Sequence, residues 1–269
     1  MTLASHTTFG HLPAIRISAP DGAEAVVTLY GAHLVSWKGA DGNERMFVSS
    51  KSALDGAKAI RGGVPVIFPQ FAEQGAGMRH GFARVSTWRL EDSGLEEDGD
   101  NAGAAWAEFC LALGDLPPNL ADAWPHQFML SLRVAVRANT LSMTLTVRNL
   151  GAAPFPFAAA LHTYHLVPDV CAVRIEGISS DEISIIDKLD AIYPHVAGRA
   201  SMNTGSGTLT IEQSGFTDAV VWNPGAVDAA ALADLENDEY KRFVCIEPAL
   251  LDPYELEPGA SWIGSYRVS

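Results

Sequence analysis

Residues 128–149, which read FMLSLRVAVRANTLSMTLTVRN, decide the fold of this chain. Large apolar side chains occupy every second position of residues 128–138 and again of residues 141–149, while small, polar or charged side chains fill most positions between them. A period of two is typical of β-strands that bury one face. We therefore predict a hairpin of two strands around a turn at Asn139-Thr140, with one face in the core.

The rest of the chain repeats this pattern in shorter pieces, with turn signals such as Asp21-Gly22 between them. The pattern predicts further strands at residues 14–18, 25–30, 31–38, 158–166, 173–175, 183–185, 208–211, 219–222, 243–247 and 261–268. Between strands it predicts loops at residues 49–59, 91–103 and 116–123, and one short helix within residues 228–240. Many short strands with very little helix predict an all-β fold, a large antiparallel β-sandwich, as one domain over residues 1–269.

The composition limits the partners of this protein. Its 269 residues carry a formal net charge of −14, which argues against nucleic acid or an anionic membrane as a partner. No apolar run approaches the length of a membrane span, and residues 1–6 lack the pattern of a secretory signal. Cys110, Cys171 and Cys245 are widely spaced and odd in number, so we expect reduced core thiols in a cytoplasmic protein, not disulfides or a metal cluster.

A basic segment stands out in this acidic chain. Residues 60–84 contain Arg61, Arg79, His80 and Arg84 together with five glycines and two prolines. Glycine and proline favour turns that approach a ligand closely, and the planar guanidinium of arginine suits carboxylate or phosphate oxygens. We interpret the segment as the lining of a pocket for an anionic or polyhydroxylated small molecule; solvated surface turns are the alternative.

Two titratable side chains follow apolar runs. His162 comes after residues 157–161, and Glu247 comes after residues 243–246. Burying a carboxylate is costly unless a partner compensates it, and an imidazole beside a desolvated carboxylate can exchange protons near neutral pH. We predict that the two form an acid–base pair; a core histidine and a salt-bridged strand-end carboxylate are the alternatives. His165 lies three residues from His162, a spacing that points the two rings to opposite faces of a strand and disfavours a shared metal.

Five motifs span most of the chain: Arg61-Gly62-Gly63-Val64-Pro65 with Phe68-Pro69, His80-Gly81-Phe82-Ala83-Arg84, Ala160-Leu161-His162-Thr163-Tyr164, Val221-Trp222-Asn223-Pro224, and Tyr240-Lys241 through Glu247. In their residues and their order, these motifs resemble a known family, the hexose-6-phosphate mutarotase (glucose-6-phosphate 1-epimerase) branch of the aldose 1-epimerases.

The resemblance implies a galactose mutarotase-like supersandwich that interconverts the α and β anomers of a hexose 6-phosphate without a metal or an organic cofactor. It implies that His162 is the general acid and Glu247 the general base. It also implies that Arg61, Arg79 and Arg84 hold the substrate, beside His80. Relatives place a sugar-binding Asp before an Arg, and the corresponding residues 197–201 contain no carboxylate. Asp187 and Asp190 are the candidates to replace it.

Two other functions remain open on the sequence: a mutarotase for an unphosphorylated aldose, and a non-catalytic sugar-phosphate-binding protein. The number of arginines facing the pocket separates the first from the leading hypothesis, while the presence of both His162 and Glu247 favours an enzyme over the second. A structural carbohydrate-binding sandwich is disfavoured because no attached catalytic domain is evident. We expect a monomer whose partner is a small-molecule sugar phosphate.

Overall fold

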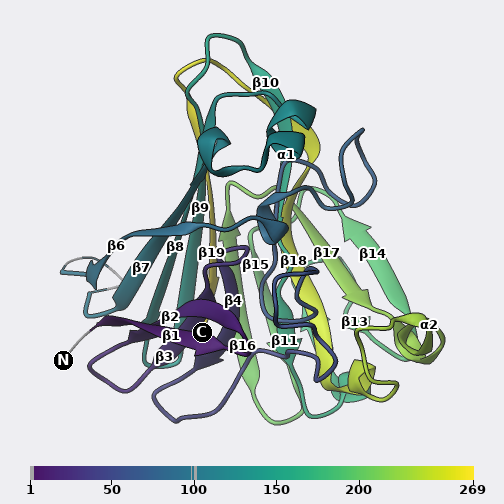
Figure 1. The fold of residues 1–269 in the computed structure, drawn as a ribbon. Coiled ribbons are helices and arrows are strands. Elements are labelled where there is room, and N and C mark those ends of the chain that lie inside the picture. The colour runs from purple at the N-terminus through teal and green to yellow at the C-terminus, as the bar shows by residue number, and fades with distance from the viewer. Residues whose placement is uncertain (1–2, 98, 100–101) are drawn as a thin grey trace.

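The computed structural model describes residues 3–97, 99 and 102–269. The first two residues, and residues 98, 100 and 101 of the predicted loop at 91–103, lie outside this description. Within it, the strands form three sheets whose named strands all pair antiparallel (Figure 1). The predicted all-β fold is confirmed.

The first sheet has four strands in chain order: β1 (Ala4–Phe9), β2 (Leu12–Ser18), β3 (Glu24–Thr28) and β4 (His33–Lys38). The largest follows the order β13-β12-β15-β16-β19-β9-β8-β7-β6, with bounds β6 (Arg89–Leu95), β7 (Ala105–Ala112), β8 (Phe128–Arg137), β9 (Thr140–Asn149), β12 (Arg174–Glu176), β13 (Ile183–Ser184), β15 (Arg199–Asn203), β16 (Thr208–Ser214) and β19 (Ser261–Val268). The third follows the order β14-β17-β18-β10-β5, with bounds β5 (Val66–Ile67), β10 (Phe155–Leu161), β14 (Leu189–Tyr193), β17 (Asp218–Asn223) and β18 (Phe243–Leu256), and β18 also pairs with β11 (Tyr164–Leu166).

Helices are few and short in the described chain. They are α1 (Pro118–Ala123), α2 (Gly225–Ala231) and the 3₁₀ turns η1 (Ala83–Val85), η2 (Leu113–Asp115), η3 (Val170–Ala172) and η4 (Glu239–Arg242). None of the described helices has the length and apolar character to cross a membrane. Figure 1 shows the two larger sheets side by side, with β1–β4 near one end of them and α1 at the other.

The hairpin predicted from residues 128–149 is confirmed as β8 and β9. The strands pair from Phe128 opposite Asn149 to Arg137 opposite Thr140, so the two-residue turn is Ala138-Asn139, one position earlier than predicted. The large apolar side chains of both strands are buried in the main core, together with side chains of the six-stranded sheet such as Leu161 and Ile246. Packing between these two sheets therefore forms the main core, to which side chains of β2–β4 such as Ile15 and Trp37 also belong.

Several predicted boundaries were wrong, each because tertiary contacts outweigh local signals. Part of the predicted loop at 91–103 is strand β6, which pairs with β7 despite its acidic residues. Residues 118–123 of the predicted connection form α1, which begins at a proline. The predicted strand 158–166 is divided into β10 and β11, and the predicted helix ends at Ala231, before its expected apolar stripe is complete.

The cysteines are only partly as predicted. All three are free, and Cys110 and Cys245 are buried, but Cys171 is exposed in η3. An apolar sequence neighbourhood predicted burial of Cys171, whereas a short surface turn capped by Asp169 presents it to solvent.

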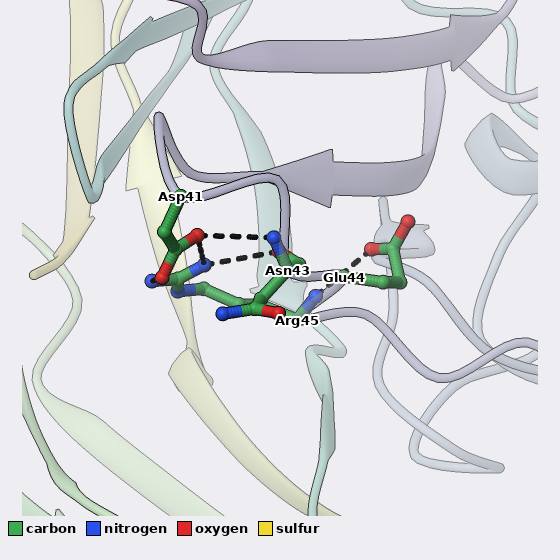
Figure 2. A network of polar contacts seen from close by, with 4 residues as sticks. All are labelled: Asp41, Asn43, Glu44 and Arg45. Atoms are coloured by element: carbon green, nitrogen blue, oxygen red, sulfur yellow. Dashed lines mark hydrogen bonds and ion pairs between the residues drawn. The ribbon is translucent and has the colours of Figure 1, made fainter.

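The basic segment is attached to the sheets by a tightly bonded turn after β4. The Arg45 guanidinium makes two bonds to the Asp41 carboxylate, of 3.1 and 3.0 Å, and donates to the Asn43 carbonyl at 3.0 Å (Figure 2). A Glu44 carboxylate oxygen accepts the backbone N–H groups of Arg45 and Met46. This network fixes the start of the long loop that leads to Arg61.

Gly63 then fixes the end of that loop. Its N–H donates to the Phe47 carbonyl at 2.6 Å, its carbonyl accepts from the Tyr164 N–H at 2.9 Å, and its φ of +58° lies in the left-handed region. A Cβ at this position would collide with the Leu34 carbonyl oxygen. Only glycine therefore allows the backbone beside Arg61 to lie against both β4 and β11.

We predict that Gly63→Ala destabilises the protein more than Gly42→Ala. Both glycines have positive φ, which costs alanine about 1–2 kcal/mol, but a Cβ on Gly42 meets no atom within 4 Å. The added collision at Gly63 should cost about 1–3 kcal/mol more. Urea unfolding of the two variants measures the difference, and equal losses would contradict the account of Gly63.

Candidate active site

Alternation along β18 places Glu247 on one face of the six-stranded sheet. Val244 and Ile246 point into the main core between the sheets, whereas Phe243 and Cys245 belong to a separate cluster on the opposite face. Glu247 continues the second series and is buried. It lies within the strand, because β18 runs on to Leu256, so the predicted strand-end position was wrong.

The same alternation places His162 on that face. In β10, Ala159 and Leu161 face the main core while Ala158 and Ala160 face away, and His162 follows directly in the second series. His165 instead donates to or accepts from the Tyr266 hydroxyl of β19 at 2.9 Å, deep in the structure. The prediction that the two histidines point apart is confirmed, and His165 is a packed histidine.

His162 and Glu247 are in direct contact. The Nε2 of His162 lies 3.3 Å from the Oε1 of Glu247, and their side chains are 11% and 1% exposed. The other ring nitrogen of His162 and the Oε2 of Glu247 are buried without a hydrogen-bond partner among the described residues. Each member of the pair therefore has one polar atom that is left free to bond to a ligand.

Burial shapes the proton equilibrium of this pair. Burial, and secondarily the Asp190 carboxylate, raises the pKa of Glu247 well above its ordinary value. Burial, with the nearby His80, Arg61 and Arg84, lowers the pKa of His162 well below its ordinary value. Both shifts disfavour the charged forms of the two groups, and over a contact of 3.3 Å a proton can pass between them.

Register brings a second row of side chains to the same face. Tyr164 of β11 pairs with Cys245, Cys245 with Trp222 of β17, and Trp222 with Asp190 of β14. Directly paired residues of an antiparallel sheet point to the same side, so these four form one row across four strands. The Tyr164 ring stacks on His162, with centroids 4.9 Å apart and planes 9° apart, which fixes the imidazole orientation.

The basic segment, residues 60–84, lines the site beside the acid–base pair. Arg61 donates to both carboxylate oxygens of Asp234, at 3.2 and 3.1 Å, and to the Tyr164 hydroxyl at 3.1 Å. Burial alone would lower the pKa of Arg61, but Tyr164 and Asp234 outweigh burial and raise it. Arg61 is therefore a fixed, charged group whose charge is largely compensated.

Arg84 and Arg79 differ from Arg61, and from each other, in their ion pairs. Arg84 donates to the Arg79 carbonyl at 2.8 Å, and no carboxylate within residues 3–97, 99 and 102–269 forms an ion pair with it. Burial, partly offset by Tyr164, lowers the pKa of Arg84 to about 10, and Arg61 and Arg79 add to this shift. The exposed Arg79 pairs with Glu73 at 3.4 Å. Of the three arginines, Arg84 is thus the one without an acidic partner among the described residues.

His80 lies between the arginines and the acid–base pair. Its φ is +62°, its Nδ1 accepts the Ala72 N–H at 3.2 Å, and its ring centroid is 5.8 Å from that of His162. Burial and the three arginines lower the pKa of His80 to about 3. His80 is therefore neutral at physiological pH, with its proton on Nε2.

All six side chains predicted for the site line one cavity of about 440 Å³. Its lining also includes Lys58, Pro65, Phe71, Tyr164, Asp190, Val220, Trp222, Leu232 and Asp234. The volume lies within the range of roughly 300–1,000 Å³ typical of small-molecule sites.

Of the two candidates to replace the family's sugar-binding Asp, the described lining of this cavity includes Asp190 and not Asp187, and it adds Asp234, which the sequence analysis missed. Gly198 and Arg199 line a different, smaller hollow. Asp190 and Asp234 face the cavity instead, from β14 and from the loop after α2. Asp190 alternates with half-buried apolar residues in a short strand, a weak signal, and no sequence signal marks Asp234.

One group in the described chain has the side chains for a metal. His162, Cys245 and Glu247 each offer one ligand atom, and these atoms lie within 4.8 Å of one another. The expectation that the protein works without a metal or cofactor remains a prediction.

Comparison with known proteins places this site in a family. The sequence profile described as aldose 1-epimerase matches residues 13–194, more than half of the chain. The chain belongs to the aldose 1-epimerase family. A relative of this epimerase from Cenchrus ciliaris, named "Putative glucose-6-phosphate 1-epimerase", is 32% identical over an alignment 287 residues long, which covers 94% of this chain and 86% of the relative.

Solved structures share the fold of the epimerase. A structure described as "a putative mutarotase (YeaD)" from Salmonella typhimurium aligns with a TM-score of 0.87 at 24% identity, over 99% of this chain and 92% of the other. A galactose mutarotase-like protein from Clostridium acetobutylicum aligns with a TM-score of 0.74 at 17% identity, over 99% and 97%. The predicted family, its isomerase class and its galactose mutarotase-like fold are confirmed.

We predict that Glu247→Gln makes the protein more stable than the parent at alkaline pH. A carboxyl whose pKa is raised by folding stabilises the protein fully below its unfolded pKa of about 4.5, and this contribution is lost as pH rises through the folded pKa. Glutamine does not titrate, so the advantage of the variant should grow with pH by about 1.4 kcal/mol for each pKa unit of elevation.

Urea unfolding near pH 4.5 and near pH 8 measures this difference. Glu257→Gln, at an exposed position, is the matched control and should change the unfolding free energy by less than about 0.5 kcal/mol at either pH. A constant difference between Glu247→Gln and the parent across this range would contradict the raised pKa.

Proposed function

We propose that this epimerase interconverts the α and β anomers of a hexose 6-phosphate by general acid–base catalysis. The observation that carries the proposal is the contact of 3.3 Å between His162 and Glu247, facing a cavity that also holds Arg84. The name of the Cenchrus ciliaris relative agrees with this substrate.

The reaction needs a proton donor and a proton acceptor side by side. In a cyclic sugar, the anomeric hydroxyl oxygen and the ring oxygen are bonded to the same carbon. When the proton shared by the pair lies on His162, Glu247 is a carboxylate. It then takes the proton of the anomeric hydroxyl while His162 gives its proton to the ring oxygen, and the bond between the anomeric carbon and the ring oxygen breaks. The aldehyde then rotates, and reversal of both proton transfers closes the ring on its other face.

The shared proton of the resting pair suits this cycle. Each turnover leaves the pair with the same number of protons, so no exchange with solvent is needed. Tyr164 and the Arg61–Asp234 pair hold the imidazole in place before substrate arrives, and neutral His80 offers its Nε2 proton to a substrate oxygen. Such prearranged donors act without reorganisation in a site of low dielectric constant.

Arg84 is the proposed anchor for the phosphate. It faces the cavity and has no carboxylate partner among the described residues, and an approaching dianion would offset the burial that now lowers its pKa. Arg79 and Lys58 add positive charge at the rim. Asp190 is the proposed acceptor for sugar hydroxyls, because Asp234 is already bonded to Arg61.

We also propose that residues 1–269 act as a single domain and as a monomer in the cytoplasm. Segments from 58–84, 162–164, 190 and 220–247 of one chain supply the whole lining of the cavity. The three free cysteines are in keeping with a reducing compartment.

We predict that Glu247→Gln slows catalysed anomer exchange of glucose 6-phosphate by about 10²- to 10⁴-fold, because an amide cannot take the hydroxyl proton. Magnetisation transfer between the two anomeric protons in NMR measures the exchange rate. The stability measurements above show whether the variant is folded, and phosphosugar binding should persist. Exchange at the parent rate would refute the assignment of Glu247.

We predict that Arg84→Ala weakens binding of glucose 6-phosphate far more than binding of glucose, since a charge-assisted bond to phosphate is lost. Arg79→Ala is the matched control: the Arg79 side chain is 63% exposed and paired with Glu73, so the loss of affinity should be smaller. Calorimetric titration with both sugars measures the losses. Equal losses for the two sugars in Arg84→Ala would favour a free aldose as the substrate.

A further inference from the structure

Cys245 is a buried side chain beside the acid–base pair that the proposed reaction does not use. It lies two residues before Glu247 in β18, so both point to the same face of the sheet, and His162 contacts Glu247 from the neighbouring segment. All three residues are buried. Their ligand atoms lie within 4.8 Å of one another, although His162 is 83 residues from Cys245 and 85 residues from Glu247 in the sequence.

The three side chains are of kinds that commonly bind metal ions. Zn²⁺ binds thiolate, imidazole and carboxylate at roughly 2.0–2.3 Å, so its ligand atoms in a tetrahedral site lie roughly 3.3–3.8 Å apart. A closure of about 1 Å in the longest separation would bring the set to that geometry. Mg²⁺ and Ca²⁺ prefer oxygen ligands, so the thiol selects a softer ion.

A second observation points to a ligand at this place. Glu247 has a buried carboxylate oxygen with no hydrogen-bond partner among the described residues, and this oxygen belongs to a side chain that is only 1% exposed. A buried, unsatisfied carboxylate oxygen is costly, and a cation would remove that cost. His162 and Glu247 line the cavity, whereas Cys245 is fully buried in a cluster with Phe47, Tyr164 and Phe243. An ion would therefore enter from the cavity and meet the thiol last.

We propose that His162, Cys245 and Glu247 bind Zn²⁺ or a similar thiophilic divalent cation, and that the bound ion inhibits the epimerase. The inhibition rests on the proposed function, whereas the binding does not. On binding, the thiol proton and the proton shared by His162 and Glu247 pass to solvent, and the metal takes the positions of both. The pair then has no proton to give and no free carboxylate to accept one. The fourth position of the ion faces the cavity.

The test begins with full-length protein that has been treated with a chelator and dialysed. Competition with a chromophoric chelator measures the affinity and stoichiometry of Zn²⁺ binding. Substitution by Co²⁺ gives absorption bands that report the ligands. NMR magnetisation transfer gives the anomer exchange rate at each metal concentration. We expect one ion per chain, a thiolate-to-cobalt charge-transfer band, and loss of exchange in proportion to occupancy. Faster exchange with Zn²⁺, or no binding by a protein that is active without metal, would overturn the proposal.

Cys245→Ser is the decisive variant, because it removes the thiolate and keeps the size of the side chain. We expect metal-free exchange near the parent rate, no charge-transfer band, and Zn²⁺ affinity lower by at least about 10- to 100-fold, the loss known for outer-shell partners alone. Cys110→Ser and Cys171→Ser are controls that should bind and respond as the parent does. If the serine variant does not fold, Cys245→Ala replaces it.

The outcomes separate the two proposals. If Cys245→Ser binds Zn²⁺ and is inhibited like the parent, the metal site is refuted while the proposed function stands. If the parent binds one Zn²⁺ through Cys245 but catalyses no anomer exchange without metal, the metal site stands and the proposed function fails.

Discussion

The burial of the Glu247 carboxylate in the middle of β18 is the constraint on which the site depends. A lone carboxylate in that position costs several kcal/mol, so neighbouring strands must supply a partner. His162 supplies it from the end of β10, at 3.3 Å. The same β18 buries Val244 and Ile246 in the main core on its other face, so the strand cannot shift by one residue without exposing them and losing the pair. Core packing therefore holds the chemistry in register.

The arginines around this pair differ in whether an acidic side chain compensates their charge. Arg61 is compensated by Asp234 and orients Tyr164, which in turn stacks on the imidazole of His162. Arg84 is left without an acidic partner in the described chain and so keeps its charge for a ligand. A chain with a net charge of −14 can hold an anion in this way because a pocket responds to its local charges more than to the total.

Much of the fold was predictable from the alternation of apolar and polar side chains along the sequence. The β8–β9 hairpin was recognised because each strand has one large apolar side chain at every second position over ten residues, a signal that packing later reinforced. Strand β14 was missed because only alternate residues of a five-residue segment are half-buried, and part of β6 was missed because its acidic side chains face solvent. In both cases, pairing with a neighbouring strand supplied the order that the local sequence lacked.

The sequence by itself determined the residues able to do the chemistry: an imidazole and a carboxylate after apolar runs, and arginines in a glycine-rich segment. Only the tertiary structure decided which of them meet and what else meets them. Asp190, Asp234 and Cys245 reach the site through strand register and loop packing, and His165 is turned away from it towards Tyr266. The physical reason is that side-chain periodicity is a local property that the sequence carries, whereas the pairing of strands from distant parts of the chain depends on the free energy of the whole core.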